Sequence, residues 1–480
     1  MAALRSHAGA KAFVQLVSWI GTVYVLRTLD SDALGVFALA TVAFAYASMV
    51  YEGGMLEALV QHDPATPLER RSVFTLLAAS GIALGCIVAG GAPLFARLME
   101  AAQVAPILMT MALALLITAL GILPHAQLIR EMRFGRLAII SSAQAVASSG
   151  VSVTLAYAGA GAWSLALGLV AGLLVRTTLL NICVPSLFMP TLRIAPALHY
   201  MRFGGILIAD GLLWRWYNSL DTLLLGRWSG AASLGHYSFA QQLANMPLEK
   251  ISTVVNDVSL PAYAELASRR SEAARLMVET IRTHAVVGLP IFWGIACVAD
   301  VAVPLIFGAQ WQPAIFALTA IALVAPLRLM GSVETPAMTG IGAPQVLLKT
   351  KLVIVPVMTL AIFVGCRWGG VNGAALAWLG AFPLCYVIAF RWVLRAMALT
   401  YKDVVAVVRG PALAAGLMVC AVRLVAEGME RLVVAPLPSL VALIAAGAVA
   451  YMALLRALDR EAYGLLLDRA RQLVLPARAG

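Results

Sequence analysis

The sequence predicts an all-α polytopic membrane protein with about fourteen transmembrane helices: two six-helix lobes related by a parallel repeat, then two C-terminal helices. Three observations lead to this prediction: the composition, the spacing of the apolar runs and an internal repeat. Of the 480 residues, 62% are hydrophobic and 12% are charged, whereas a soluble domain has about 45–50% and about 25%. This composition excludes a soluble globular protein.

Apolar runs of about 18 to 25 residues, bounded by charges or by Pro/Gly clusters, recur along the chain, and each predicts one spanning helix. In chain order the predicted helices cover residues 12–29, 34–58, 73–96, 105–124, 137–157, 163–184, 203–226, 235–258, 284–307, 314–337, 345–366, 372–394, 404–425 and 438–456. They divide the chain into an N-terminal lobe (1–200), a C-terminal lobe (201–400), two additional helices (401–456) and a tail (457–480).

The two ends of the chain need separate interpretation. The first run follows Arg5 and Lys11 as in a secretion signal, but no small-x-small cleavage pattern follows it, so we expect a retained first helix. The tail alternates apolar residues with charged ones such as Asp459 and Arg460, which predicts a short amphipathic helix at the inner surface of the membrane.

Charge placement predicts the orientation. The net charge of +11 would suggest nucleic acid in a soluble protein. Here most Lys and Arg residues lie at the N-terminus, in the even-numbered connectors and in the tail. By the positive-inside rule both termini are then cytoplasmic, and no nucleic-acid partner is expected. The six cysteines lie singly in or beside apolar runs and are interpreted as packing residues, with no metal and no cofactor.

Three pairs of similar short stretches, called echoes below, indicate a repeat of six helices. Arg27 with Leu34-Gly35 recurs as Arg227 with Leu234-Gly235, residues 161–164 resemble 370–373, and the basic connector 133–136 resembles 349–351. Because six is an even number, the two lobes have the same orientation in the membrane.

The chain resembles the bacterial polysaccharide flippases of the multidrug/oligosaccharidyl-lipid/polysaccharide exporter superfamily over almost its whole length. The stretches that carry the resemblance are Val25-Leu26-Arg27-Thr28-Leu29, Glu52-Gly53-Gly54, Arg202-Phe203-Gly204, residues 218–227, residues 234–240, Asn245-Met246-Pro247, Leu260-Pro261-Ala262-Tyr263 and residues 308–314. The chain departs from the family pattern at Asp30-Ser31-Asp32 and at Glu52.

The resemblance implies a function and its partners. Such proteins move polyprenyl-diphosphate-linked oligosaccharide repeats to the outer leaflet by alternating access, for exopolysaccharide, capsule or lipopolysaccharide synthesis. A polysaccharide polymerase and a chain-length regulator are expected partners, and a proton or sodium ion is the expected coupling ion.

Arg215 is the sharpest substrate-binding candidate because ionisable groups within spans are expensive and usually functional. Its guanidinium could bind diphosphate, and Trp214 and Trp216 beside it could stack on sugar. The alternative is an internal ion pair with Asp210 or Asp221.

Further candidates come from both halves of the chain. Arg27 and Arg227 could form a cationic gate at the outer ends of equivalent helices, or could instead snorkel to headgroups or hold the following turns. Asp221, with Asn218, is the candidate for cation coupling, or else a packing residue. Gln241 and Asn245 form a polar strip suited to glycan hydroxyls, or to bonds between helices.

Two other classes of function compete with the flippase. Asp30-Ser31-Asp32 could bind the metal of a glycosyltransferase, but its loop is too short for an acceptor site. A cation-coupled multidrug-type exporter would favour an acidic cavity, whereas arginines favour an anionic lipid-linked sugar, which a peptidoglycan-precursor flippase would also bind.

Overall fold

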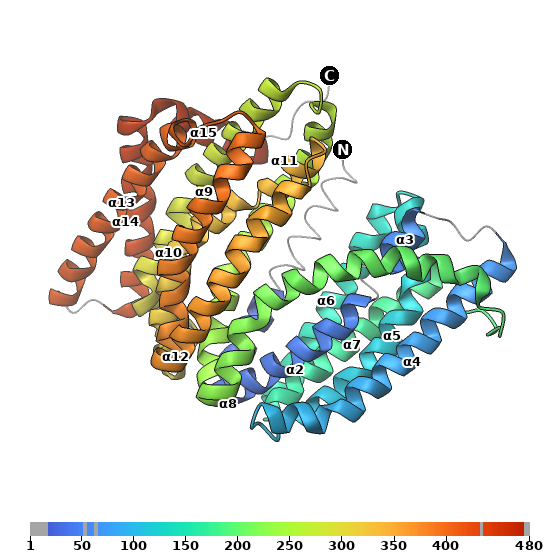
Figure 1. Ribbon diagram of the computed structural model, residues 1–480. Coiled ribbons are helices and arrows are strands. Elements are labelled where there is room, and N and C mark those ends of the chain that lie inside the picture. Colours follow the sequence, from blue (N-terminus) through green and yellow to red (C-terminus); the bar gives the residue numbers. More distant parts are fainter. Residues whose placement is uncertain (1–17, 51–54, 62–65, 433–434, 475–480) are drawn as a thin grey trace. The chain divides into compact units, whose positions relative to one another are not determined.

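The computed structural model describes residues 18–50, 55–61, 66–432 and 435–474 (Figure 1). Throughout these ranges the regular structure is helical, and ten helices are long and apolar enough to cross a membrane. The predicted all-helical, multi-pass membrane protein is confirmed at this level. The expected basic N-terminal segment with Arg5 and Lys11, and the motif Glu52-Gly53-Gly54, lie outside the described residues.

The chain divides into two compact units, Met1–Ser238 and Phe239–Gly480. In the first unit, a helix over residues 18–28 is followed by α2 (Ser31–Val50), α3 (Leu56–Gln61), α4 (Pro67–Leu98), α5 (Val104–Arg130), α6 (Phe134–Tyr157), α7 (Ala162–Cys183), η2 (Ala195–Ala197) and the first part of α8 (Leu198–Glu265). Helix α5 is central and packs against α2, α3, α4 and α7. Its Leu108, Met111 and Leu115 are buried, whereas Ile82, Ile87 and Leu94 of α4 are exposed, as expected of side chains that face lipid.

The second unit contains the rest of α8, α9 (Arg270–Ile306), η3 (Ala309–Ala314), α10 (Ile315–Gly331), α11 (Glu334–Gly340), α12 (Gln345–Ala396), α13 (Tyr401–Arg431), α14 (Pro436–Leu458) and α15 (Arg460–Val474). Helix α9 is central here and packs against α10, α13, α14 and α15. The Tyr451 hydroxyl of α14 donates to the Val286 carbonyl of α9 at 2.8 Å. The Arg282 guanidinium of α9 pairs with Asp459 at 2.6 Å and with Glu461 at 2.7 Å, which holds α15 against α9.

Glycines break two long helices at the places where the sequence separates two predicted spans. Helix α8 is interrupted at Gly230 (φ 80°, ψ 169°) and α12 at Gly370 (φ 53°, ψ −131°). Gly161, which the sequence echo matches with Gly370, has nearly the same conformation (φ 53°, ψ −132°). Because side chains rarely tolerate positive φ, glycine is required at these turns.

The two segments of the first echo, around Gly35 and around Gly235, pack against each other. A Cβ built on Gly35 would overlap the carbonyl oxygen of Ala231, and one built on Gly235 would overlap that of Ser31. Each glycine of the two Leu-Gly pairs therefore packs on the backbone of the residue that lies four positions before the other glycine. Small residues permit this close approach of α2 and α8, as they do between membrane helices generally.

Several helix boundaries differ from the prediction. Helix α9 begins at Arg270 instead of residue 284. The expected connector is helical because Ala273, Met277 and Ile281 recur at helical spacing and form a buried face. The exposed pairs Arg269–Glu272 and Arg275–Glu279, each at 3.0 Å, lie along the same segment. Helix α5 continues to Arg130, and α2 ends at Val50 inside the predicted helix 34–58. The predicted helix 314–337 is divided into α10 and α11.

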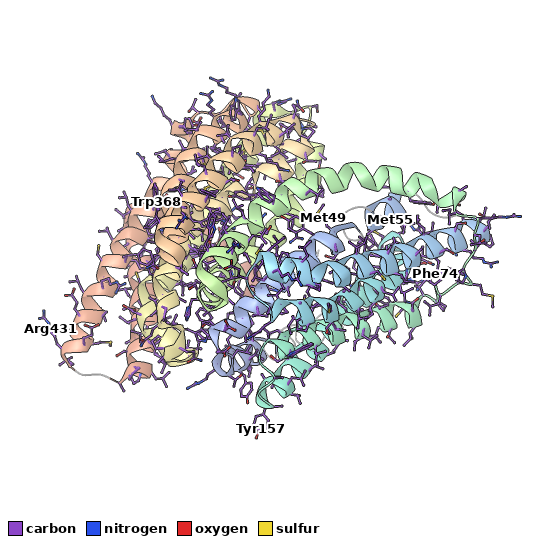
Figure 2. The ribbon with its side chains drawn as sticks, turned by 60° about the horizontal axis from the view of Figure 1, so that its bottom comes forward. Met49, Met55, Phe74, Tyr157, Trp368 and Arg431 are labelled. Carbon is purple, nitrogen blue, oxygen red and sulfur yellow. The ribbon has the colours of Figure 1, made fainter. Side chains whose placement is uncertain are left out.

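Exposed aromatic side chains mark the ends of spans. Tyr157 at the end of α6 is 83% exposed and Trp368, near the break in α12, is 84% exposed (Figure 2). Aromatic residues at such positions are typical of the membrane–water interface.

Candidate functional site

Arg215 lies on α8 in an aromatic segment. Trp214 and Trp216 are 54% and 43% exposed, Arg215 is half-buried, and the rings of Trp214 and Tyr217 lie 5.5 Å apart between centroids. Among the residues that the structure describes, the Arg215 guanidinium has no acidic partner; the Asp210 side chain lies outside them. The alternative considered for Arg215, an ion pair with Asp221, is not formed, and the two flanking indoles are exposed.

The segment is held against α2 through Ser219, which lies one helical turn after Arg215 on the same face of α8. The Ser219 hydroxyl donates to the Arg215 carbonyl at 2.7 Å and bonds with the Tyr46 hydroxyl of α2 at 2.8 Å. Asn218 donates from Nδ2 to the Trp214 carbonyl at 2.8 Å. These bonds hold the backbone that carries Arg215 and its two tryptophans.

Asp221 is fully buried and held by donors. Its Oδ2 accepts from the Tyr237 hydroxyl at 2.7 Å and its Oδ1 accepts from the Thr222 N–H at 2.9 Å. Since Tyr237 lies beyond the break at Gly230, the carboxylate ties the two parts of α8 together. This arrangement matches the packing alternative for Asp221 and leaves its coupling role a prediction.

The two candidate gate arginines both lie four residues before the close crossing of α2 and α8. Arg227 pairs with Glu100 of the α4–α5 turn at 2.9 Å, and the pair is exposed. Arg27 is exposed and also has an interaction partner. An exposed pair of this kind contributes little stability, and the gate role of the two arginines stays a prediction.

A second polar cluster lies in the second unit. Asn245 on α8 accepts at Oδ1 from the Arg328 guanidinium of α10 at 2.8 Å, and that guanidinium lies 4.7 Å from the ring centroid of Trp378 on α12. Gln241, one turn before Asn245, is half-buried and already has a partner. The predicted polar strip therefore includes a cation over an aromatic face, a geometry suited to sugar and phosphate groups.

The sequence reasoning missed Arg328, Trp378 and a buried acid, Glu334, as functional candidates. Glu334 is 7% exposed and lies next to the side chain of Tyr386. An ionisable residue within an apolar run was the available signal for Arg328 and Glu334.

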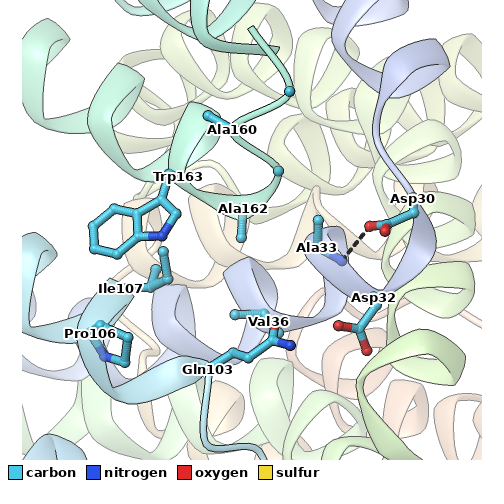
Figure 3. Close-up of a pocket in the computed structure, with 12 residues that line it drawn as sticks. Asp30, Asp32, Ala33, Val36, Gln103, Pro106, Ile107, Ala160, Ala162 and Trp163 are labelled. Atoms are coloured by element: carbon cyan, nitrogen blue, oxygen red, sulfur yellow. Dashed lines mark hydrogen bonds between the residues drawn. The ribbon is translucent and has the colours of Figure 1, made fainter.

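The Asp-x-Asp motif lines a cavity of about 380 Å³ at one end of the first unit, together with Gln103 and Trp163 (Figure 3). Asp30 accepts at Oδ1 from the Ala33 N–H at 2.8 Å, a bond that Figure 3 shows, and so caps the start of α2. Helix capping thus accounts for Asp30 without a metal.

Replacing Asp30 with alanine should lower the free energy of unfolding by about 1 kcal/mol, because the cap acceptor is lost. Asp30→Asn should retain most of the stability, and Asp32→Ala should serve as the neighbouring control. Thermal unfolding of the purified chain in detergent measures this; equal losses for Asp30→Ala and Asp32→Ala would contradict the capping role.

Comparison with known proteins agrees with these features. The model of the polysaccharide biosynthesis protein family matches residues 25–316, more than half of the chain. The chain is 27% identical over 463 residues to the succinoglycan biosynthesis transport protein ExoT of Rhizobium meliloti (strain 1021), covering 94% of this chain and 91% of the relative. It is 25% identical over 358 residues to the lipopolysaccharide biosynthesis protein WzxC of Escherichia coli (strain K12), covering 74% and 72%.

Solved structures share the fold. The lipid II flippase MurJ matches with a TM-score of 0.78 at 14% identity, over 95% of this chain and 99% of that chain. An inward-facing multidrug resistance MATE family transporter of the MOP superfamily matches with a TM-score of 0.61 at 15% identity, over 81% and 94%. Helical spans, the matched family model and this shared fold identify the chain as a multi-pass membrane transport protein of the polysaccharide biosynthesis protein family.

Proposed function

We propose that this chain translocates polyprenyl-diphosphate-linked oligosaccharide repeat units across the bacterial inner membrane by alternating access, for exopolysaccharide, capsule or lipopolysaccharide synthesis. The observation that carries the proposal is Arg215: a half-buried guanidinium on a membrane helix, flanked by two exposed tryptophans and without an acidic partner among the described residues. Relatives named for lipopolysaccharide biosynthesis and succinoglycan transport support it.

The substrate's chemistry explains why such a cluster is needed. A diphosphate must leave water to cross the bilayer, and a planar guanidinium can replace its hydration with two parallel hydrogen bonds. Indole rings offer an apolar face and an N–H donor to sugar rings. The Arg328, Asn245 and Trp378 cluster offers the same chemistry in the second unit.

The proposed architecture has fourteen spans. Dividing α8 at Gly230 and α12 at Gly370, and adding the helix over residues 18–28, supports this number. The reciprocal packing of Gly35 and Gly235 and the shared conformation of Gly161 and Gly370 support a parallel repeat of lobes 1–200 and 201–400, followed by helices in 401–456 and a tail in 457–480. Both termini are proposed to be cytoplasmic, and a polymerase and a chain-length regulator are proposed partners.

The test uses cells that lack this chain, complemented with the wild type, Arg215→Ala or Arg215→Lys. Without the chain, intact lipid-linked repeats should accumulate on the cytoplasmic side. A charged hydrogen-bonding group contributes about 1.5–3 kcal/mol, so Arg215→Ala should lower polysaccharide output roughly 10- to 100-fold. Arg215→Lys should rescue only partly, because an ammonium lacks the guanidinium fork. Mass spectrometry of the polyprenyl-linked sugars provides the measurement.

The matched control is Arg431→Ala, an exposed arginine at the end of α13 (Figure 2), which should restore wild-type output. Repeats that lack one sugar would indicate a glycosyltransferase instead. An unchanged lipid profile would favour a cation-coupled small-molecule exporter, and accumulation of a peptidoglycan precursor would indicate a flippase for that lipid.

A further inference from the structure

Glu334 is a buried carboxyl inside a candidate span. It lies at the first residue of α11, within the apolar stretch Ala309–Gly340, and only 7% of its surface is exposed. Among the described residues its Oε1 atom has no hydrogen-bond partner. A carboxylate in such surroundings would carry an uncompensated charge at a cost of several kcal/mol, whereas a protonated carboxyl would not.

A single phenol faces this carboxyl. Tyr386 of α12 lies next to Glu334 and is held by rings stacked on either side, Phe382 at 5.6 Å and Phe390 at 5.4 Å between centroids. Gly331 makes room for it, since a Cβ there would lie 3.0 Å from the Tyr386 ring. The phenol is therefore fixed in position to bond with the acid.

The other titratable groups near α11 are two tyrosines, a histidine and an arginine. Tyr401 of α13 acts on Tyr386 and donates its hydroxyl to the Val387 carbonyl. Tyr263 of α8 lies beside Gly340 at the other end of α11, and His284 of α9 lies beside Leu329 on α10. Arg328, almost two turns before Glu334, is engaged by Asn245 and Trp378. No described cation compensates a charge on Glu334.

We propose that Glu334 is the residue that binds and releases the coupling proton of this transporter. The inference rests on the proposed transport function and selects the proton over sodium. Hard cations require several oxygen ligands, whereas the described residues offer one carboxyl and one phenol here, and they contain no group of three or more acidic, His or Cys side chains that could hold a metal ion.

The position of Glu334 gives the proton a route. The acid follows the break between α10 and α11, where Ser332 and Val333 lie outside both helices. In the proposed orientation the turn after α11 lies on the cytoplasmic side and leads to the first turns of α12, which carry Lys349 and Lys351. When this break opens to water, the proton leaves to the cytoplasm and Glu334 becomes an anion; reprotonation from the outer side and closure return it to the neutral state.

The variant Glu334→Gln separates coupling from packing, because it is isosteric, neutral and able to bond with Tyr386. If Glu334 only packs, Gln should work as well as Glu. If it must release a proton, Gln should fold normally and lower polysaccharide output at least tenfold, while Glu334→Asp should retain part of the output with an altered pH profile. Glu427→Gln, an exposed acid on α13, is the matched control.

The proton site is tested independently of transport by infrared difference spectroscopy of the purified full-length chain in lipid. The carbonyl band of a protonated carboxylic acid should be present at neutral pH in the wild type and in Glu427→Gln, and should lose intensity in Glu334→Gln. An unchanged band in Glu334→Gln, or wild-type output from that variant at every pH, would overturn the proposal. Failure of the flippase assignment would show differently, as a normal lipid profile in cells that lack the chain, with the infrared result unaffected.

Discussion

Replacing Asp221 with alanine is expected to reduce the amount of folded protein in the membrane severely. The carboxylate is fully buried and accepts from the Tyr237 hydroxyl at 2.7 Å and the Thr222 N–H at 2.9 Å. Loss of a buried acceptor costs about 1–3 kcal/mol, and more where the group is charged. Because the two donors lie on either side of the break at Gly230, we expect this loss to loosen the junction within α8.

Asp221→Asn distinguishes the two roles considered for this residue. An amide keeps an acceptor for the Tyr237 hydroxyl but cannot exchange a proton. If Asp221 only packs, the Asn variant should be present at near wild-type amounts and support near wild-type polysaccharide output. Normal amounts with output lost would restore Asp221 as a coupling residue, and normal amounts of Asp221→Ala would contradict its structural role. Quantitative immunoblotting of membranes, together with polysaccharide assay, measures both quantities.

Gly235→Ala is expected to have the second large effect. Its new Cβ would overlap the Ser31 carbonyl oxygen, and this neighbour is backbone that cannot rotate away. Overpacking typically costs about 1–3 kcal/mol and occasionally more. The helices α2 and α8 would have to separate, which should lower the thermal stability of the purified protein and its output in cells.

The reciprocal contact provides an internal check. Gly35→Ala should be as damaging as Gly235→Ala, since its Cβ would overlap the Ala231 carbonyl oxygen. Gly90→Ala is the matched control, because a Cβ on Gly90 meets nothing within 4 Å and alanine is the better helix former. Thermal unfolding of the three purified variants measures whether the two crossing glycines, unlike Gly90, are required for stability. Equal stability of Gly235→Ala and Gly90→Ala would show that the crossing is looser than described.

The sequence by itself determined the class of protein and most of its helices. A bilayer imposes long apolar runs, so the pattern predicts α4, α6, α7 and α14 to within a few residues. The Leu-Gly echo is also visible in the sequence, but only the structure shows that both glycines lie at a close helix crossing, which requires small residues. The sequence placed helix ends less well at α9, where a buried face that includes Met277 and Ile281 continues the helix through a segment rich in charged residues.

Only the tertiary structure decided what the polar side chains do. Asp221 is held by Tyr237 from beyond a helix break, Asn245 by Arg328 from another helix, and Glu334 is buried against Tyr386 of α12. Spacing along the chain contains no information about such partners, because packing between helices brings them together. The role of each charge in a membrane depends on that partner, since an ionised group away from water is stable only when it is paired.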